Sequence, residues 1–149
     1  ERAGLERLMQ NNPLYNHILE YVKTHQRNGK LLSKDPSIRN ALAQLEVEYN
    51  VGRLFCYYVA WVLDQGRIPN LEAAMCKAYC TQFEKRLSDL STRILGPYGQ
   101  ILSGSTEVPL DGEAAECYLW SPCYTIQGGS VEILKNIVAT RGLSLPTEK

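Results

Sequence analysis

The sequence predicts an all-α protein, an antiparallel helical bundle of three long and two short helices. Apolar residues recur at three- and four-residue steps over three long stretches, which is the period of a helix with one buried face. Turns containing glycine and proline separate these stretches, and no alternation of apolar and polar residues is sustained enough to indicate a strand. Long helices joined by short turns pack antiparallel, so we expect a bundle.

The first helix is expected from residue 1 to about residue 26. Asn11-Asn12-Pro13 interrupts it, because proline removes a backbone donor and clashes with the preceding turn. We expect a kink there, or a new helix with Pro13 in its first turn. A polar turn around Gly29 follows. Since the helical pattern is present from the first residue, we expect the chain to be a piece of a longer protein.

Asp35 and Pro36 supply an N-cap and a first-turn proline for the second helix, which we expect to reach about Asp64. The third helix is expected to be capped at Asn70 and to end at Gly96-Pro97. Seven apolar residues of the second helix lie near the seven-residue spacing of a bundle seam: Ile38, Leu42, Leu45, Tyr49, Leu54, Tyr58 and Val62.

A loop rich in glycine and serine follows the third helix up to Gly112, and loops of this length are often functional. A short helix is predicted over residues 113–124, broken or bent by Ser121-Pro122. The last helix is predicted to be capped by Ser130 and ended by Gly142. Four of its apolar residues are expected on one buried face: Ile133, Leu134, Ile137 and Val138.

Composition and charge narrow the class of protein. The chain has 149 residues, 44% hydrophobic and 21% charged, which fits one globular domain. Its 16 basic residues balance 16 acidic ones, so no charge pattern points to nucleic acid or an anionic membrane. No apolar run approaches the ~20 residues of a membrane span, and residues 1–7 do not resemble a signal peptide. A cytoplasmic or matrix setting is therefore expected.

The five cysteines indicate reduced thiols, because an odd number scattered over this length does not suggest a disulfide framework. Cys76 and Cys80 are spaced to share a helical face and would suit two metal ligands. The sequence shows no third or fourth ligand beside them, and His17 and His25 lie far away along the chain. We therefore predict no metal site and treat the cysteines as small buried hydrophobic residues.

The stretch from Ile126 to Pro146 carries the strongest functional signal. Gly128 and Gly129 free the backbone to approach a ligand, and the helix N-terminus behind them can hold an anion or a polar cofactor edge. The whole string, from Ile-Gln-Gly-Gly-Ser to Arg-Gly-Leu-Ser-Leu-Pro, resembles the C-terminal signature of acyl-CoA dehydrogenases. The helix order also resembles that family's C-terminal helical domain. The resemblance thus covers the entire chain and implies a flavoprotein that oxidises thioesters.

Two further stretches resemble family landmarks that contact FAD. Residues 93–100 stand where members carry a Gln-x-x-Gly-Gly-x-Gly segment, which makes Arg93 and Gly96 candidate cofactor contacts; Arg93 replaces the glutamine and Pro97 the second glycine. The turn after the first helix stands where members carry an arginine that pairs with the FAD pyrophosphate. A register without gaps in the helix puts Arg27 there, whereas alignment on Gly29 would put His25 there. We prefer Arg27, because deletions are tolerated better in loops than in helices.

The family's reaction needs a carboxylate that takes a proton from the carbon beside the thioester. Many members carry this glutamate in the glycine turn, at the position that Gly128 holds here. Other members carry it on the first long helix, before an arginine, and the register that selects Arg27 puts Glu1 there, followed by Arg2. Glu1 is therefore the candidate base. Gly128 is expected to donate its backbone N–H to the thioester oxygen.

Ser130 and Glu132 match family positions at which the turn meets the flavin and its ribose, and they would also serve as N-cap and first-turn carboxylate. The resemblance implies FAD as cofactor, acyl-CoA as substrate, an electron-transfer flavoprotein or similar acceptor, and a homo- or hetero-tetramer. The isolated domain would be inert. One alternative is a catalytically silent dehydrogenase-like subunit that serves assembly, and another is an unrelated helical interaction module.

Overall fold

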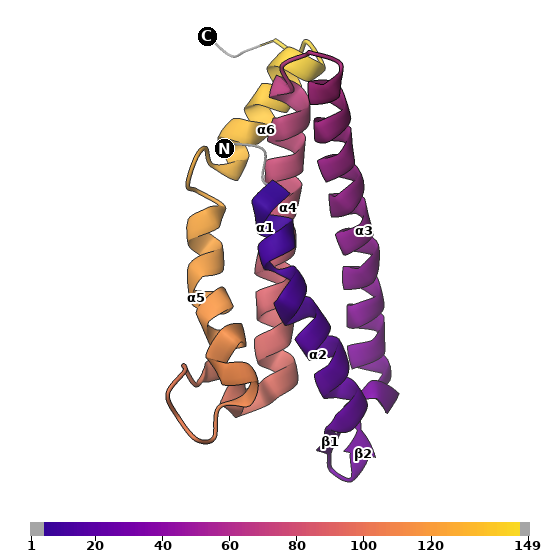
Figure 1. Cartoon of the computed structure of the whole chain (residues 1–149), viewed down its shortest axis with the longest axis vertical. Coiled ribbons are helices and arrows are strands. Elements are labelled where there is room, and N and C mark those ends of the chain that lie inside the picture. The colour runs from indigo at the N-terminus through magenta and orange to yellow at the C-terminus, as the bar shows by residue number, and fades with distance from the viewer. Residues whose placement is uncertain (1–4, 147–149) are drawn as a thin grey trace.

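A computed structural model of the chain describes residues 5–146, and they form the predicted all-α bundle (Figure 1). Two-residue strands form a small hairpin, β1 (Gln26–Arg27) with β2 (Lys30–Leu31). Short 3₁₀ segments cover Leu32–Lys34, Gly96–Gln100 and Pro109–Gly112, and a π-helical turn covers Val138–Gly142. The helices are, in chain order, α1 (Leu5–Gln10), α2 (Asn12–Thr24), α3 (Pro36–Asp64), α4 (Asn70–Leu95), α5 (Glu113–Tyr124) and α6 (Val131–Ile137).

Helix α4 is the central rod of the bundle and contacts α1, α3, α5 and α6. In Figure 1 it lies between α3 on one side and α5 with α6 on the other. Because α4 has neighbours on several sides, some of its polar side chains are buried, among them Thr81 and Ser88. The Thr81 hydroxyl donates to the Lys77 carbonyl at 2.9 Å, and the Ser88 hydroxyl donates to that of Ser121 at 3.1 Å. These bonds satisfy polar groups that water does not reach.

The predicted break in the first helix is confirmed. The chain forms α1 and α2, with Pro13 in the first turn of α2. The side chain of Asn11, which is 4% exposed, fills the junction: its amide donates to the Arg7 carbonyl at 2.6 Å, and it accepts from the Cys117 thiol at 3.4 Å. Asn11 therefore ties the break to α5.

Two helix starts show how caps decide boundaries. Helix α3 begins at Pro36 as predicted, and the Asp35 carboxylate accepts from the Ser37 amide at 2.8 Å. The prediction that Asn70 caps α4 is wrong. The Pro69 carbonyl already accepts the first helical bond, from Ala73 at 2.9 Å, so Asn70 is the first helical residue and its side chain makes no cap bond.

The seam of α3 follows the prediction up to Tyr49 and again at Val62, which is buried, but not between them. Leu54 and Tyr58 are 65% and 43% exposed, whereas Gly52 and Val59 are buried. Three residues after Tyr49, the buried face of α3 continues with Gly52. Glycine has no apolar side chain, so the spacing of apolar residues in the sequence does not reveal this position. A Cβ at Gly52 would lie 3.1 Å from the side chain of Leu8, so a larger residue would require Leu8 to shift by a few tenths of an ångström.

Of the two outcomes predicted for Ser121-Pro122, a break or a bend, the break does not occur, because α5 runs through to Tyr124. Proline lacks the N–H that would bond the Tyr118 carbonyl, and the Ser121 hydroxyl donates to that carbonyl instead, at 3.3 Å. Within residues 5–146, no helix is long and apolar enough to cross a bilayer.

Candidate functional site: a glycine turn and two clefts

Residues 125–130 form the turn that joins α5 to α6. Gly128 and Gly129 have φ values of 69° and 114°, in the region that side chains disfavour, so this backbone path requires glycine. The Val131 amide closes the turn by donating to the Thr125 carbonyl at 3.1 Å.

Lys77 of α4 binds the backbone of the turn. Its ammonium donates to the carbonyl oxygens of Gln127 and Gly129, at 2.5 and 2.8 Å, and its side chain is buried. The two carbonyls flank Gly128, so one cation fixes the backbone on both sides of it. Lys77 was not predicted from the sequence, where its one signal is a lysine among the apolar positions of α4.

Gly128 is an exposed residue, and its amide pairs with no acceptor among residues 5–146. A donor held in this way, on a backbone fixed by Lys77, can serve a carbonyl oxygen of a ligand without reorganising the turn. The role expected for Gly128, donation of its N–H to a thioester oxygen, requires a donor of this kind.

Ser130 caps α6 as predicted, since its hydroxyl oxygen accepts from the Ile133 amide at 3.4 Å. Glu132 lies in the first turn, and hydrogen bonds from its own backbone N–H and from the Ser130 hydroxyl lower its pKa. Glu132 is thus a carboxylate at the helix N-terminus. The expected buried face of α6 is partly wrong, because Val131 and Leu134 are buried while Ile133 is 54% exposed.

Arg27 lies in the β1–β2 hairpin at the other end of the bundle. Asn28 and Gly29 form its two-residue turn, with φ values of 52° and 75°, as a tight hairpin of this kind requires. The Arg27 guanidinium donates through Nη2 to the Ile94 carbonyl at 2.6 Å. Arg27 therefore lies beside the C-terminal end of α4. Its partner there, Ile94, is two residues before Gly96.

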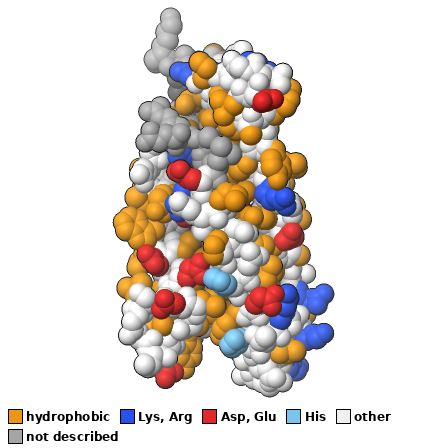
Figure 2. All heavy atoms as spheres, in the orientation of Figure 1, with side chains coloured by type: hydrophobic (Ala, Val, Ile, Leu, Met, Phe, Trp, Pro, Cys, Tyr) orange, Lys and Arg blue, Asp and Glu red, His pale blue; other side chains and the backbone are white. Residues whose placement is uncertain are grey.

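A cleft of about 480 Å³ opens at the hairpin, and three of its lining side chains are basic: Arg27, Lys30 and Lys34. Figure 2 shows Lys and Arg side chains gathered at the lower right, near this end of the bundle. His25 is not among the residues that line this cleft, and its ring stacks on that of Tyr21 with centroids 3.7 Å apart. Lys30 and Lys34 were not predicted as site residues, although the sequence places them three and seven residues after Arg27.

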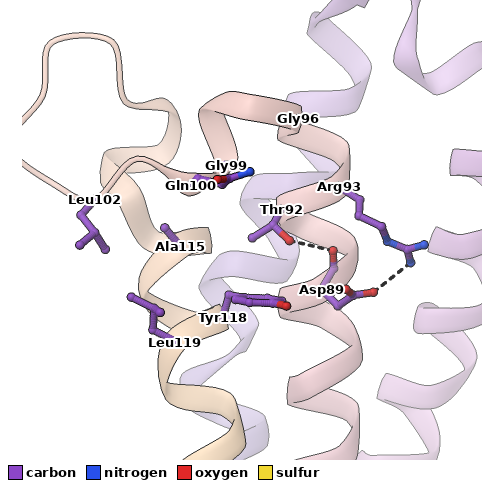
Figure 3. A pocket seen from close by; sticks show the side chains of 10 residues that line it. All are labelled: Asp89, Thr92, Arg93, Gly96, Gly99, Gln100, Leu102, Ala115, Tyr118 and Leu119. Atoms are coloured by element: carbon purple, nitrogen blue, oxygen red, sulfur yellow. Dashed lines mark hydrogen bonds and ion pairs between the residues drawn. The ribbon is translucent and has the colours of Figure 1, made fainter.

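A larger cleft, of about 650 Å³, lies between the C-terminal end of α4, the segment after it, and α5 (Figure 3). Arg93 and Gly96 both line it. Arg93 is tied to Asp89, with Nη2 and Oδ2 3.2 Å apart, and Figure 3 shows its side chain turned toward that carboxylate. Gly99 lets the backbone press on α4, because a Cβ there would lie 2.7 Å from the Thr92 carbonyl oxygen.

The predicted site residues thus form two groups. Arg27, Arg93 and Gly96 lie around the C-terminal end of α4, while Gly128, Ser130 and Glu132 lie at the glycine turn. The anchors of the two groups on α4, Ile94 and Lys77, are seventeen residues apart, or ~25 Å along the helix axis. Glu1, the candidate base, lies outside the described residues.

Comparison with known proteins gives a consistent result. A family model described as "Acyl-CoA dehydrogenase, C-terminal domain" matches residues 3–143. The chain is 32% identical to a glutaryl-CoA dehydrogenase of Desulfococcus multivorans over 122 residues, which are 81% of this chain and 29% of that protein. It is 28% identical over 122 residues to a benzylmalonyl-CoA dehydrogenase of Aromatoleum aromaticum, covering 30% of it. The chain therefore spans less than a third of the length of these curated relatives.

Solved structures agree with the sequence comparison. An acyl-CoA dehydrogenase from Geobacillus kaustophilus superposes with a TM-score of 0.81 at 26% identity, over 93% of this chain and 34% of that one. A glutaryl-CoA dehydrogenase in complex with glutaryl-CoA gives 0.79 at 28% identity, over 96% and 34%. The ChsE4-ChsE5 complex from Mycobacterium tuberculosis, at 19% identity and a TM-score of 0.84 over 97% and 36%, shares the fold. Fold, glycine turn and family match agree: the chain belongs to the acyl-CoA dehydrogenase family and corresponds to its C-terminal helical domain.

Proposed function

We propose that the chain is the C-terminal domain of an FAD-dependent acyl-CoA dehydrogenase, which forms a double bond between the α and β carbons of an acyl-CoA thioester. The observation that carries this proposal is the amide of the exposed residue Gly128, which has no acceptor among residues 5–146 and lies between two carbonyls that Lys77 binds. The relatives named glutaryl-CoA and benzylmalonyl-CoA dehydrogenase support the substrate class. In this proposal the remaining domains lie elsewhere in a longer chain, and the isolated domain is inert.

Gly128 would act on the thioester oxygen. As the proton leaves the carbon beside the thioester, negative charge grows on that oxygen, and a fixed N–H donor stabilises it. Loss of one donor of this kind costs roughly 10²–10³ in rate. FAD, when bound, supplies the acceptor for the hydride that leaves the next carbon.

The base must come from outside the turn, because position 128 carries no side chain. Glu1 is the residue that the family register selects, and we propose it as the group that takes the proton. A carboxylate does so more readily when an apolar environment raises its pKa.

The residues present suit FAD. One N–H of the Arg27 guanidinium donates to the Ile94 carbonyl. A guanidinium has five N–H donors, so Arg27 can still pair with a phosphate. Lys30 and Lys34 line the same cleft and add positive charge for a pyrophosphate. Ser130 and Glu132 offer a hydroxyl and a carboxylate to the flavin end, and Arg93 and Gly96 stand at the neighbouring cleft.

The two groups of site residues favour an oligomer. Because they are ~25 Å apart along α4, we assign the hairpin group to the FAD of a neighbouring subunit and the glycine turn to the FAD of its own. Helix α3 offers a surface for such assembly, since its outer face exposes large apolar side chains: Val47, Leu54, Tyr57, Tyr58 and Trp61. A homo- or hetero-tetramer, with an electron-transfer flavoprotein or similar acceptor, completes the proposal.

A second candidate function is a catalytically silent subunit in a complex of unlike chains. The observation that favours it is the combination of a turn without carboxylate and an Arg93 paired with Asp89. A solved structure titled "Tcur3481-Tcur3483 steroid ACAD G363A variant" is similar to this chain, at 26% identity and a TM-score of 0.84.

The test uses the intact protein with Glu1→Gln. Glu6→Gln is the matched control, because Glu6 also precedes an arginine and its side chain is exposed on α1. We expect Glu1→Gln to abolish acyl-CoA oxidation while FAD stays bound, and Glu6→Gln to retain activity. Activity that survives Glu1→Gln would remove Glu1 from the base role, and an intact protein without bound flavin would favour the silent subunit.

A further inference from the structure

Three cysteine thiols meet between α3 and α4, and none of them belongs to the sites above. Cys56 lies ten residues before Gly66, in the turn that joins the two helices, and Cys76 lies ten residues after it. Residues equally far from the turn of an antiparallel helix pair lie side by side. Cys80 follows one helical turn after Cys76, on the same face of α4. The structure thus supplies the third thiol that the sequence analysis did not find.

The sulfur atoms have the spacing of a metal site. The Sγ atoms of Cys56 and Cys76 are 3.9 Å apart, those of Cys76 and Cys80 are also 3.9 Å apart, and all three lie within 4.8 Å of one another. Thiolates lie ~2.3 Å from a bound Zn²⁺, which separates two of them by ~3.8 Å in a tetrahedral and ~4.0 Å in a trigonal arrangement. The Cys56–Cys76 and Cys76–Cys80 sulfur distances therefore already match those around a bound metal ion.

The surroundings favour a soft cation. Cys76 and Cys80 are fully buried, whereas Cys56 is partly exposed and offers an entry path. Three thiolates this close together repel one another unless a cation lies between them. On binding, the S–H protons pass to solvent as metal–sulfur bonds form.

We propose that Cys56, Cys76 and Cys80 bind one thiophilic d¹⁰ metal ion through three thiolates, with Cu(I) preferred to Zn(II). Soft thiolates select Cu(I), whereas structural zinc is almost always four-coordinate. Within residues 5–146, no fourth histidine, cysteine, aspartate or glutamate joins the cluster. The bound ion would cross-link α3 to α4 and stabilise the folded bundle. This site is independent of the proposed dehydrogenase function.

The test is a titration of the reduced, intact protein with Cu(I) under anaerobic conditions, with bicinchoninate as competitor. We expect one Cu(I) per chain, and an affinity at least ~10-fold lower for Cys76→Ser. Cys123→Ser is the matched control, because Cys123 is exposed and outside the cluster, and it should bind as the wild type does. A parallel titration with Zn²⁺ against a chromophoric chelator should show weaker binding.

A second measurement does not depend on the variant folding. Bound Cu(I) should protect Cys56 of the wild type from iodoacetamide, while Cys123 remains reactive, as read by mass spectrometry. X-ray absorption of the copper form should show sulfur neighbours alone. The proposal is overturned if the wild type releases all Cu(I) to the chelator, if folded Cys76→Ser binds as tightly, or if Cys56 stays reactive. Tighter binding of Zn²⁺ would overturn the preference for Cu(I).

Discussion

The ammonium of Lys77 lies 2.8 Å from the carbonyl oxygen of Gly129, which joins the central helix directly to the turn that distinguishes this domain. A second bond, to the Gln127 carbonyl, makes the attachment two-sided. The turn therefore takes its position from α4 rather than from its own short helix.

Replacement of Lys77 by methionine should loosen the turn. Two carbonyls lose their donor, and we expect the free energy of unfolding to fall by ~1–3 kcal/mol. If the proposed function holds, kcat should fall as well, because the Gly128 amide is no longer fixed. Lys85→Met is the control, since Lys85 is exposed on the same helix. Urea denaturation and hydrogen exchange of residues 126–130 measure the effect, and unchanged exchange in Lys77→Met would contradict it.

A glutamate introduced at position 128 should not replace the catalytic base. A Cβ at this position would lie 3.9 Å from Lys77 Nζ, so a carboxylate there would have a cation as neighbour. Opposite charge lowers a carboxyl pKa and makes the group a weaker base, and φ of 69° adds strain. Gly128→Glu in the Glu1→Gln protein should remain inactive between pH 6 and 9. Recovery to within tenfold of the wild-type rate would show that this reasoning is wrong.

The ion pair between Arg7 and Glu84 should stabilise α1 against α4. Arg7 Nε lies 2.9 Å from Glu84 Oε2, Glu84 is 1% exposed, and the guanidinium lies 3.3 Å above the ring of Tyr124. Arg7→Met leaves a buried carboxylate unpaired, which costs ~3–5 kcal/mol.

The double variant Arg7→Met with Glu84→Met should recover much of that loss, because no buried charge remains without a partner. A double-mutant cycle from urea denaturation measures the coupling. Additive losses from the two substitutions would show that the pair is not coupled.

Cys117 should resist alkylation although it lines a cleft of about 410 Å³. Burial, with the negative charge of Glu84, raises its pKa to about 12, so the thiol stays protonated at pH 8 and its reactivity should increase with each pH unit up to that value. Exposed Cys123 is the internal control and should react rapidly with iodoacetamide. Equal labelling of Cys117 and Cys123 at pH 8 would contradict the burial of Cys117.

Local chemistry made much of the fold predictable. Asp35 and Ser130 cap helices by accepting from backbone amides two and three residues later in the sequence. Helices α3 and α6 begin where these residues indicate. Arrangements that depend on packing between helices were not predictable. Gly52 lies in the seam against Leu8 and Cys80, which are distant in sequence, and Cys56 joins Cys76 and Cys80 only in the paired helices. Lys77 likewise meets the glycine turn across fifty residues of sequence.

The central claim is that the intact protein oxidises an acyl-CoA at a bound flavin, with this domain supplying the glycine turn and the base. The most direct measurement is the visible absorbance of the flavin in the purified intact protein after anaerobic addition of an acyl-CoA substrate. We predict that the flavin band is lost in the wild type and in Glu6→Gln, and persists in Glu1→Gln. A flavin band that persists in the wild type with every acyl-CoA tested, or a protein that carries no flavin, would contradict the account.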